Sequence, residues 1–107
     1  MIREGFIERA IRQLRQVFAQ LLGKVDREED PALLDARLDD LYLEHLGISR
    51  QMLGVLDGPS QLRLLSDRIF VAIELVRGER DLLAAAGRAA EAEDAARRLA
   101  ELEQLDV

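Results

Sequence analysis

The chain of 107 residues contains no cysteine or tryptophan, only two prolines, and 4% aromatic residues. The absence of cysteine excludes disulfides and thiolate metal sites, so apolar packing alone must hold the fold. The longest apolar runs, residues 69–73 and 82–86, are far shorter than the roughly 20 residues that a membrane-spanning helix needs. No apolar segment near the N-terminus suits an export signal. We therefore expect a cytoplasmic protein that has no membrane partner.

Charge is unevenly spread along the chain, and its sum is −6. Residues 1–24 carry five basic and two acidic side chains, whereas residues 25–58 carry three basic and nine acidic ones. Nucleic-acid binders need a clustered basic field, because much of their affinity comes from releasing the counterions of phosphates. The acidic middle of the chain therefore argues against nucleic acid as a partner.

Apolar residues at helical spacing predict an all-α fold. Leu, Ala, Arg and Glu are the most frequent residues, which is typical of helices. A stripe of apolar residues spaced by three and four predicts an amphipathic helix over residues 2–22, and its members are Ile7, Ile11, Leu14, Phe18 and Leu21. We interpret this stripe as facing a core, although a basic amphipathic helix also suits a membrane surface or a partner protein.

Capping residues delimit the next two helices. Asp30, which precedes a proline, is a typical N-cap, so a helix is expected over residues 31–46. Gly47 can take the left-handed conformation that ends such a helix. Ser49 then caps a short helix over residues 50–56.

A fourth helix is expected after the turn at residues 57–60 and is expected to end at residue 76 or 77, before Gly78. Because this segment is apolar over most of its circumference, it is the predicted central helix. Residues 79–107 are helical by composition and form either a hairpin that turns near residues 91–93 or one long helix. The hairpin is favoured.

Together these elements predict one all-α domain over residues 1–107, with five or six helices in a compact bundle. Residues 1–78 form its four-helix part. Large apolar side chains are scarce in the C-terminal segment, where Leu99, Leu102 and Leu105 are exposed if no other helix covers them. These three leucines are the candidate interface of a protein-interaction or structural module. Its partner is unknown, and a second copy of the chain is one candidate.

Residues 43–56, LEHLGISRQMLGVL, resemble the turn of bacterial helix-turn-helix regulators, with Gly47 at the turn. The resemblance implies a DNA-binding regulator that uses residues 41–56, which is the alternative function. Leu43, however, stands where that motif holds a small residue, and the recognition helix offers only Arg50 and Gln51 to the bases. An ordinary capped helical corner is the favoured interpretation.

The polar residues form no recognisable catalytic or metal-binding pattern. His45, the only histidine, lies on an apolar stripe and is interpreted as a packing residue. The acidic link over residues 25–30 lacks the spaced ligands and central glycine of a calcium loop. Asp35 and Asp39 lie one helical turn apart, but no third group accompanies them. The sequence therefore predicts no catalytic residue, no metal site and no cofactor, and we do not expect an enzyme.

The order of these parts resembles an uncharacterised family of small bacterial all-helical proteins. The similarity lies in an Ile-x-x-Ala-Ile-x-Gln-Leu helix at residues 7–14, in Leu-Leu-Gly at residues 21–23, and in a helix that ends in Leu-Gly-Ile. The resemblance implies a C-terminal tetratricopeptide-like hairpin and no assigned reaction. In that hairpin Ala96 follows Gly87 by nine residues instead of about twelve, and Ala90 occupies an aromatic position of the repeat. The implied repeat is therefore shortened or absent.

Overall fold

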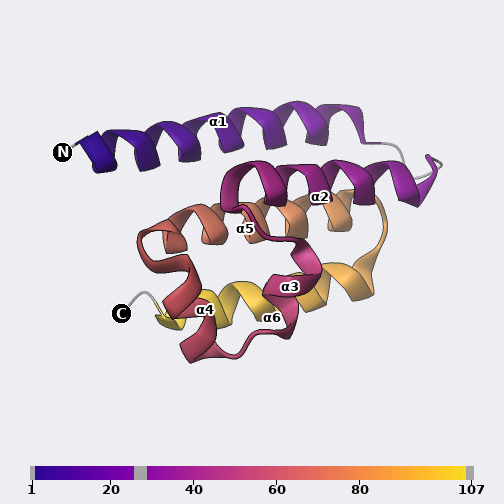
Figure 1. Cartoon of the computed structure of the whole chain (residues 1–107). Helices are drawn as coiled ribbons and strands as arrows, with labels where there is room; N and C mark the ends of the chain where they lie inside the picture. The colour runs from indigo at the N-terminus through magenta and orange to yellow at the C-terminus, as the bar shows by residue number, and fades with distance from the viewer. Residues whose placement is uncertain (1, 26–28, 106–107) are drawn as a thin grey trace.

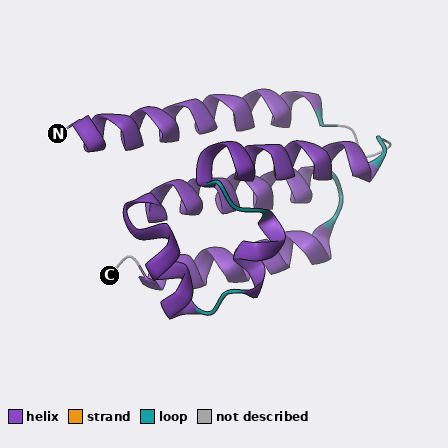
Figure 2. Cartoon of the chain, in the orientation of Figure 1, coloured by secondary structure: helices purple, strands orange, loops and turns teal. Residues whose placement is uncertain are grey.

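The structure, a computed structural model, describes residues 2–25 and 29–105, leaving out the side chains of residues 2–4. These described residues form helices and no strand, which confirms the all-α prediction (Figure 2). Residues 26–28 of the acidic link lie outside the described residues. The elements are α1 (Ile2–Lys24), α2 (Pro31–Leu46), α3 (Arg50–Val55), α4 (Gly58–Leu65), the 3-10 helix η1 (Ser66–Arg68), α5 (Ile69–Ala85) and α6 (Ala89–Leu105).

Helix α5 is the centre of the fold, because α1, α2, α4 and α6 all pack against it (Figure 1). Its buried residues cover nearly its whole circumference, and Ala72, Leu75, Val76 and Leu82 are completely inaccessible to solvent. A helix that is apolar on every side needs neighbours on every side. The prediction of a central helix in this part of the chain is confirmed, although its boundaries are different.

The boundaries differ first at Ser66, where the single helix expected between the turn at residues 57–60 and residue 77 is divided. Ser66 has a φ of +47° and a ψ of −117°, a positive-φ conformation that no α-helix contains. Helix α4 therefore ends at Leu65, and the chain enters α5 through the short 3-10 helix η1. The prediction of one continuous helix was wrong, because the apolar pattern continues on both sides of the turn.

The boundaries differ again at Gly78, which lies inside α5 and does not end it. A Cβ atom at Gly78 would lie 2.3 Å from the Phe18 ring of α1. The glycine is thus where α1 and α5 approach closely. The prediction of a helix stop at Gly78 was wrong, because the sequence does not show which glycines serve as contact points between helices.

The chain reverses between α5 and α6, so residues 79–107 do not form one long helix. The predicted hairpin within residues 79–107 was misplaced, because residues 79–85 continue α5 beyond the predicted boundary at residue 78. The turn lies at Gly87, with a φ of +82°, and not near residues 91–93 as predicted. The Arg88 amide donates a hydrogen bond to the Leu83 carbonyl at 2.9 Å, a bond that satisfies the end of α5. The first helix of the pair is α5 itself. The tetratricopeptide-like character of this hairpin stays a prediction.

The corner between α2 and α3 has the predicted caps. Gly47 takes a left-handed φ of +75°, and its amide donates to the Leu43 carbonyl at 3.1 Å. The Ser49 hydroxyl then accepts a hydrogen bond from the Met52 amide at 3.0 Å. Both contacts satisfy backbone groups that a helix end leaves unpaired, so α3 begins where the sequence indicates.

Candidate functional site

The leucines predicted as an interface lie against the rest of the chain. Leu99 and Leu102 are 4% and 1% exposed and belong to the main core, and Leu105 is partly buried beside it. Helices α5 and α4 both pack on α6 and cover these side chains. The condition on which the predicted interface depended, an uncovered α6, is therefore not met, and a candidate surface has to be sought elsewhere.

A buried carboxylate, Glu79 of α5, connects four helices. Glu79 is 2% exposed, and its Oε1 accepts a hydrogen bond of 2.6 Å from the Tyr42 hydroxyl of α2. Its Oε2 accepts from Arg50 of α3 at 3.1 Å and from Arg98 of α6 at 3.2 Å. Burial, together with this neighbouring carboxylate, raises the pKa of the Tyr42 phenol far above its usual range. The phenol thus stays a hydrogen-bond donor.

Arg50 extends the network to the acidic side of α2. Its guanidinium lies 3.0 Å from Asp39 and 3.7 Å from Asp35, in addition to its contact with Glu79. Burial opposes its charge, but the three carboxylates outweigh that effect and raise the pKa of Arg50. Asp35 also pairs with Arg88 at 2.9 Å, at the turn between α5 and α6. Helix α3 is therefore held to the rest of the molecule by one cation with several anionic partners.

The position of Glu79 in the sequence is itself a signal for this network. Glu79 lies three residues after Val76 and three before Leu82, on the buried stripe of α5. A charged residue on a stripe otherwise apolar requires a partner, because an isolated buried charge is very costly. Its partners come from three other helices, so their identity could not be derived without the fold.

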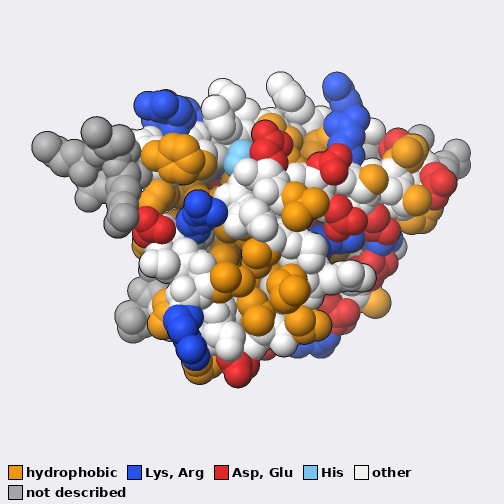
Figure 3. Space-filling view, viewed as in Figure 1, with side chains coloured by type: hydrophobic (Ala, Val, Ile, Leu, Met, Phe, Trp, Pro, Cys, Tyr) orange, Lys and Arg blue, Asp and Glu red, His pale blue; other side chains and the backbone are white. Residues whose placement is uncertain are grey.

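The helix that Arg50 holds in place exposes apolar side chains. Val55 and Met52 of α3 are 78% and 49% exposed, and Leu43 near the end of α2 is 54% exposed. Apolar side chains gather over α3 and between α3 and α4 in Figure 3. We call Leu43, Met52 and Val55 the α3 surface. Its burial by a partner would remove apolar area from water, which is the main favourable term in association.

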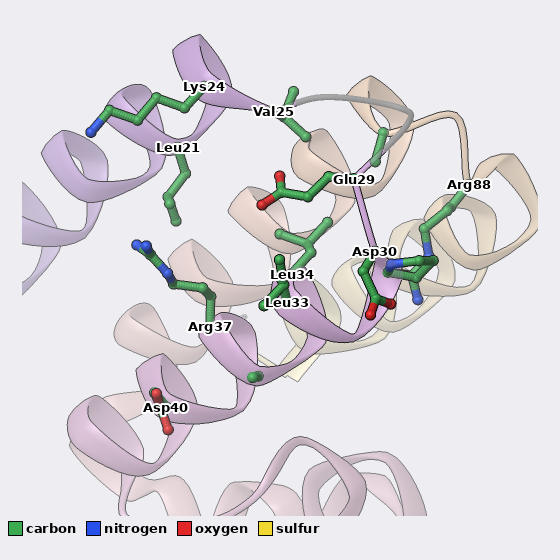
Figure 4. A pocket seen from close by; sticks show the side chains of 13 residues that line it. Leu21, Lys24, Val25, Glu29, Asp30, Leu33, Leu34, Arg37, Asp40 and Arg88 are labelled. Atoms are coloured by element: carbon green, nitrogen blue, oxygen red, sulfur yellow. The ribbon is translucent and has the colours of Figure 1, made fainter.

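Two hollows lie between α1 and α2. The larger, of about 450 Å³, is at the end where Leu21 and Lys24 of α1 lie near Leu33, Leu34 and Arg37 of α2. Figure 4 shows the Arg37 side chain extending from α2 toward Leu21, whereas Lys24 extends away from the hollow. Its mixed lining does not present a converging set of polar groups, so no reaction is assigned to it.

The second hollow, of about 390 Å³, lies at the opposite end of the two helices. Its lining includes Phe6 of α1, His45 of α2, and Asp67 and Arg68 of η1. His45 is partly buried there. The Arg68 guanidinium donates to the Leu46 carbonyl at the end of α2, at 3.3 Å. Over the described part of the chain, no group of three His, Asp or Glu side chains is arranged to hold a metal ion.

The contacts of Arg50 weaken the helix-turn-helix interpretation. Under that interpretation only Arg50 and Gln51 could reach the bases, but the Arg50 guanidinium is paired with Glu79, Asp39 and Asp35. Its side chain is only 19% exposed. Of the two expected base-reading side chains, only Gln51 is left on the exposed side of α3.

Comparisons of the chain with protein-family models, with curated proteins and with solved structures find no match. Among the described helices, none combines the length and the apolar character that crossing a bilayer requires.

Proposed function

We propose that the protein is a small cytoplasmic interaction module, which binds a partner protein through the α3 surface. The observation that carries this proposal is the exposure of Val55 and Met52 on a helix whose position is held by Arg50 and the buried Glu79. A cytoplasmic location accords with the absence of cysteine. The fully buried core of a protein interface is more apolar than its rim, and methionine is enriched in interfaces.

Anchoring of α3 matters because association costs conformational entropy. A helix of six residues is too short to be stable alone in water. The ion pairs of Arg50, together with Leu53, which is 1% exposed, order α3 before any partner arrives. A pre-ordered surface loses less entropy on binding, so more of its apolar contact energy appears as affinity.

The carboxylates of α2 that contact α3 are already paired. Asp35 and Asp39 both lie against the Arg50 guanidinium. Asp40 and Glu44, by contrast, line the two hollows between α1 and α2. We therefore expect the partner to contact the α3 surface through apolar anchors.

The test compares proteins captured from a cell extract by three forms of the chain: wild type, Val55→Lys and Leu22→Lys. Leu22 is an exposed leucine of α1, a helix that does not pack on α3, so it controls for an added surface lysine. We expect a partner that is retained by wild type and by Leu22→Lys and lost with Val55→Lys. If all three forms retain the same proteins, the α3 surface is not the binding site.

The alternative function is a DNA-binding regulator that uses residues 41–56. The caps at Gly47 and Ser49 are those that its resemblance implies. The engagement of Arg50 within the chain counts against it. A titration of the protein into duplex DNA at low salt tests this alternative, and binding no tighter than about 1 µM would exclude a specific regulator.

A further inference from the structure

A second surface, independent of α3, lies on the outer side of α1 and α2. The two helices lie side by side in Figure 1, and each packs on α5 with few contacts to the other. They run in opposite directions, because residues from the start of α1 share a hollow with the end of α2. Residues from the end of α1 share the other hollow with the start of α2.

At the end of this face where α1 begins and α2 ends, the two helices carry opposite charges, whereas Arg37 is exposed nearer the start of α2. Arg9 and Arg12 are exposed on α1, whereas Asp40 and Glu44 are exposed on α2. Figure 3 shows cationic side chains at the left and right of the upper edge of the molecule, with carboxylates between and below them. None of the four side chains forms an ion pair within the described chain. A partner that is only acidic would attract α1 but repel α2, and a partner that is only basic would do the reverse.

Exposed apolar side chains lie at both ends of the seam between the two helices. Phe6 of α1 is 65% exposed and lines the smaller hollow. Leu33 of α2 is 55% exposed and lines the larger one. Each hollow therefore has, at its rim, a large apolar side chain that the chain itself leaves uncovered.

We propose that a second copy of this chain binds across the α1–α2 face, through a two-fold axis parallel to the two helices and midway between them. This operation places the basic α1 of each copy over the acidic α2 of the other. It also brings the two Phe6 side chains together at one end of the axis and the two Leu33 side chains at the other. The face is thus complementary to itself, which is the requirement of an isologous dimer.

Charge reversal of one helix at a time provides a sharp test. Arg9→Glu/Arg12→Glu makes both helices of the face acidic, and Asp40→Arg/Glu44→Arg makes both basic. Each variant alone is expected to be monomeric, because its two copies repel each other at every contact. An equimolar mixture is expected to form a one-to-one heterodimer, because each acidic helix then meets a basic one.

Sedimentation velocity measures these states, with circular dichroism to verify that each variant is helical. The wild type is expected to dimerise reversibly, and to dissociate as salt increases, since exposed charges are screened within about 10 Å at 0.1 M salt. Arg63→Glu/Arg97→Glu is the control: it changes the net charge equally at exposed positions on α4 and α6. This control is expected to dimerise as wild type does.

The proposal is overturned if the wild type stays monomeric up to about 1 mM. It is equally overturned if either reversed variant dimerises as wild type does, or if the mixed variants fail to associate. None of these results bears on the capture experiment with Val55→Lys. Failure of the dimer and failure of the α3 surface are therefore distinguishable.

Discussion

Gly78 and Phe18 meet where α1 and α5 approach most closely, and the contact leaves no space for a side chain at Gly78. Phe18 is 5% exposed and belongs to the core that the apolar stripe of α1 predicted. The stripe alone identifies the buried face of α1. It does not identify which residue of another helix receives the ring, because that depends on the angle and distance between the helices.

We expect Gly78→Ala to lower the free energy of unfolding by about 1–3 kcal/mol, because the new methyl group must displace a buried ring. Chemical denaturation of wild type and variant measures the difference. Gly54→Ala is the matched control: Gly54 also lies in a helix, but a Cβ atom there meets nothing within 4 Å. Alanine at Gly54 is expected to raise stability by up to about 1 kcal/mol. Equal effects of the two substitutions would contradict the close contact.

A substitution at Tyr42 that removes a single oxygen atom tests the contribution of the Glu79 network to stability. Tyr42→Phe keeps the buried ring but removes the hydroxyl that donates to Glu79 Oε1, whereas Arg50 and Arg98 both donate to Oε2. We expect a loss of about 2 kcal/mol in the free energy of unfolding, typical of a hydrogen bond to a buried charged group. An unchanged denaturation midpoint would show that water replaces the phenol.

The phenol also provides a spectroscopic signal, since Tyr42 is the only tyrosine of the chain. Its raised pKa means that the folded protein should show no tyrosinate absorbance near pH 10, where free tyrosine ionises. The absorbance should appear only as the protein unfolds. Ionisation without loss of helix signal would contradict the buried hydrogen bond to Glu79.

At the scale of the elements, the caps were predictable and the internal turn at Ser66 was not. Asp30 and Ser49 each accept the backbone hydrogen bond that their position before a helix predicts. These contacts are local, so a sequence pattern is sufficient to find them. Ser66 has no comparable signature, because a residue with a positive φ is normally Gly, Asn or Asp, and nothing in the sequence marks this serine as different.

We expect Ser66→Gly to stabilise the protein by about 1 kcal/mol, since glycine adopts a positive φ without the steric cost that a Cβ atom brings. Thermal unfolding measures the change. Ser66→Ala is the control, because it removes the hydroxyl and keeps the Cβ atom, and it should not stabilise. A loss of stability in the glycine variant would show that the turn between α4 and α5 does not need the positive-φ conformation.

The arrangement of the helices explains why the interface predicted on α6 was misplaced. Leu99 and Leu102 have helical spacing, and the sequence shows that they share a face. The sequence does not show which helix lies opposite that face. Since Ser66 and the turn at Gly87 bring α4 and α5 against α6, the face that was expected to be uncovered became part of the core.

At the scale of the whole molecule, carboxylates with lowered pKa values make stability depend on pH. A backbone hydrogen bond from Ser60 lowers the pKa of Asp57, the N-cap of α4, and a hydrogen bond from Arg88 lowers that of Glu91. A carboxyl group with a lower pKa in the folded state binds protons more readily when unfolded. Its stabilising contribution is complete above the ordinary carboxyl range and is lost as the pH falls through the folded-state pKa.

We therefore expect the melting temperature to fall on acidification from about pH 5 to pH 3, where carboxyl groups titrate. Asp57→Asn is the control, since asparagine also caps a helix but does not titrate, and its pH dependence should be weaker than that of wild type. A melting temperature that stays constant over this range would show that these contacts do not contribute to stability.

The central position of α5 has a consequence for synthesis on the ribosome. α1 emerges before α5, and α5, the helix on which it packs, ends at Ala85, about 60 residues later in the chain. At about 5–20 residues per second, this delay is on the order of 3–12 s. During that interval the apolar stripes of α1 and α2 have no native helix to cover them. A nascent chain stalled before α5 should therefore be a substrate for chaperones that bind exposed apolar segments, and one released after Leu105 should not.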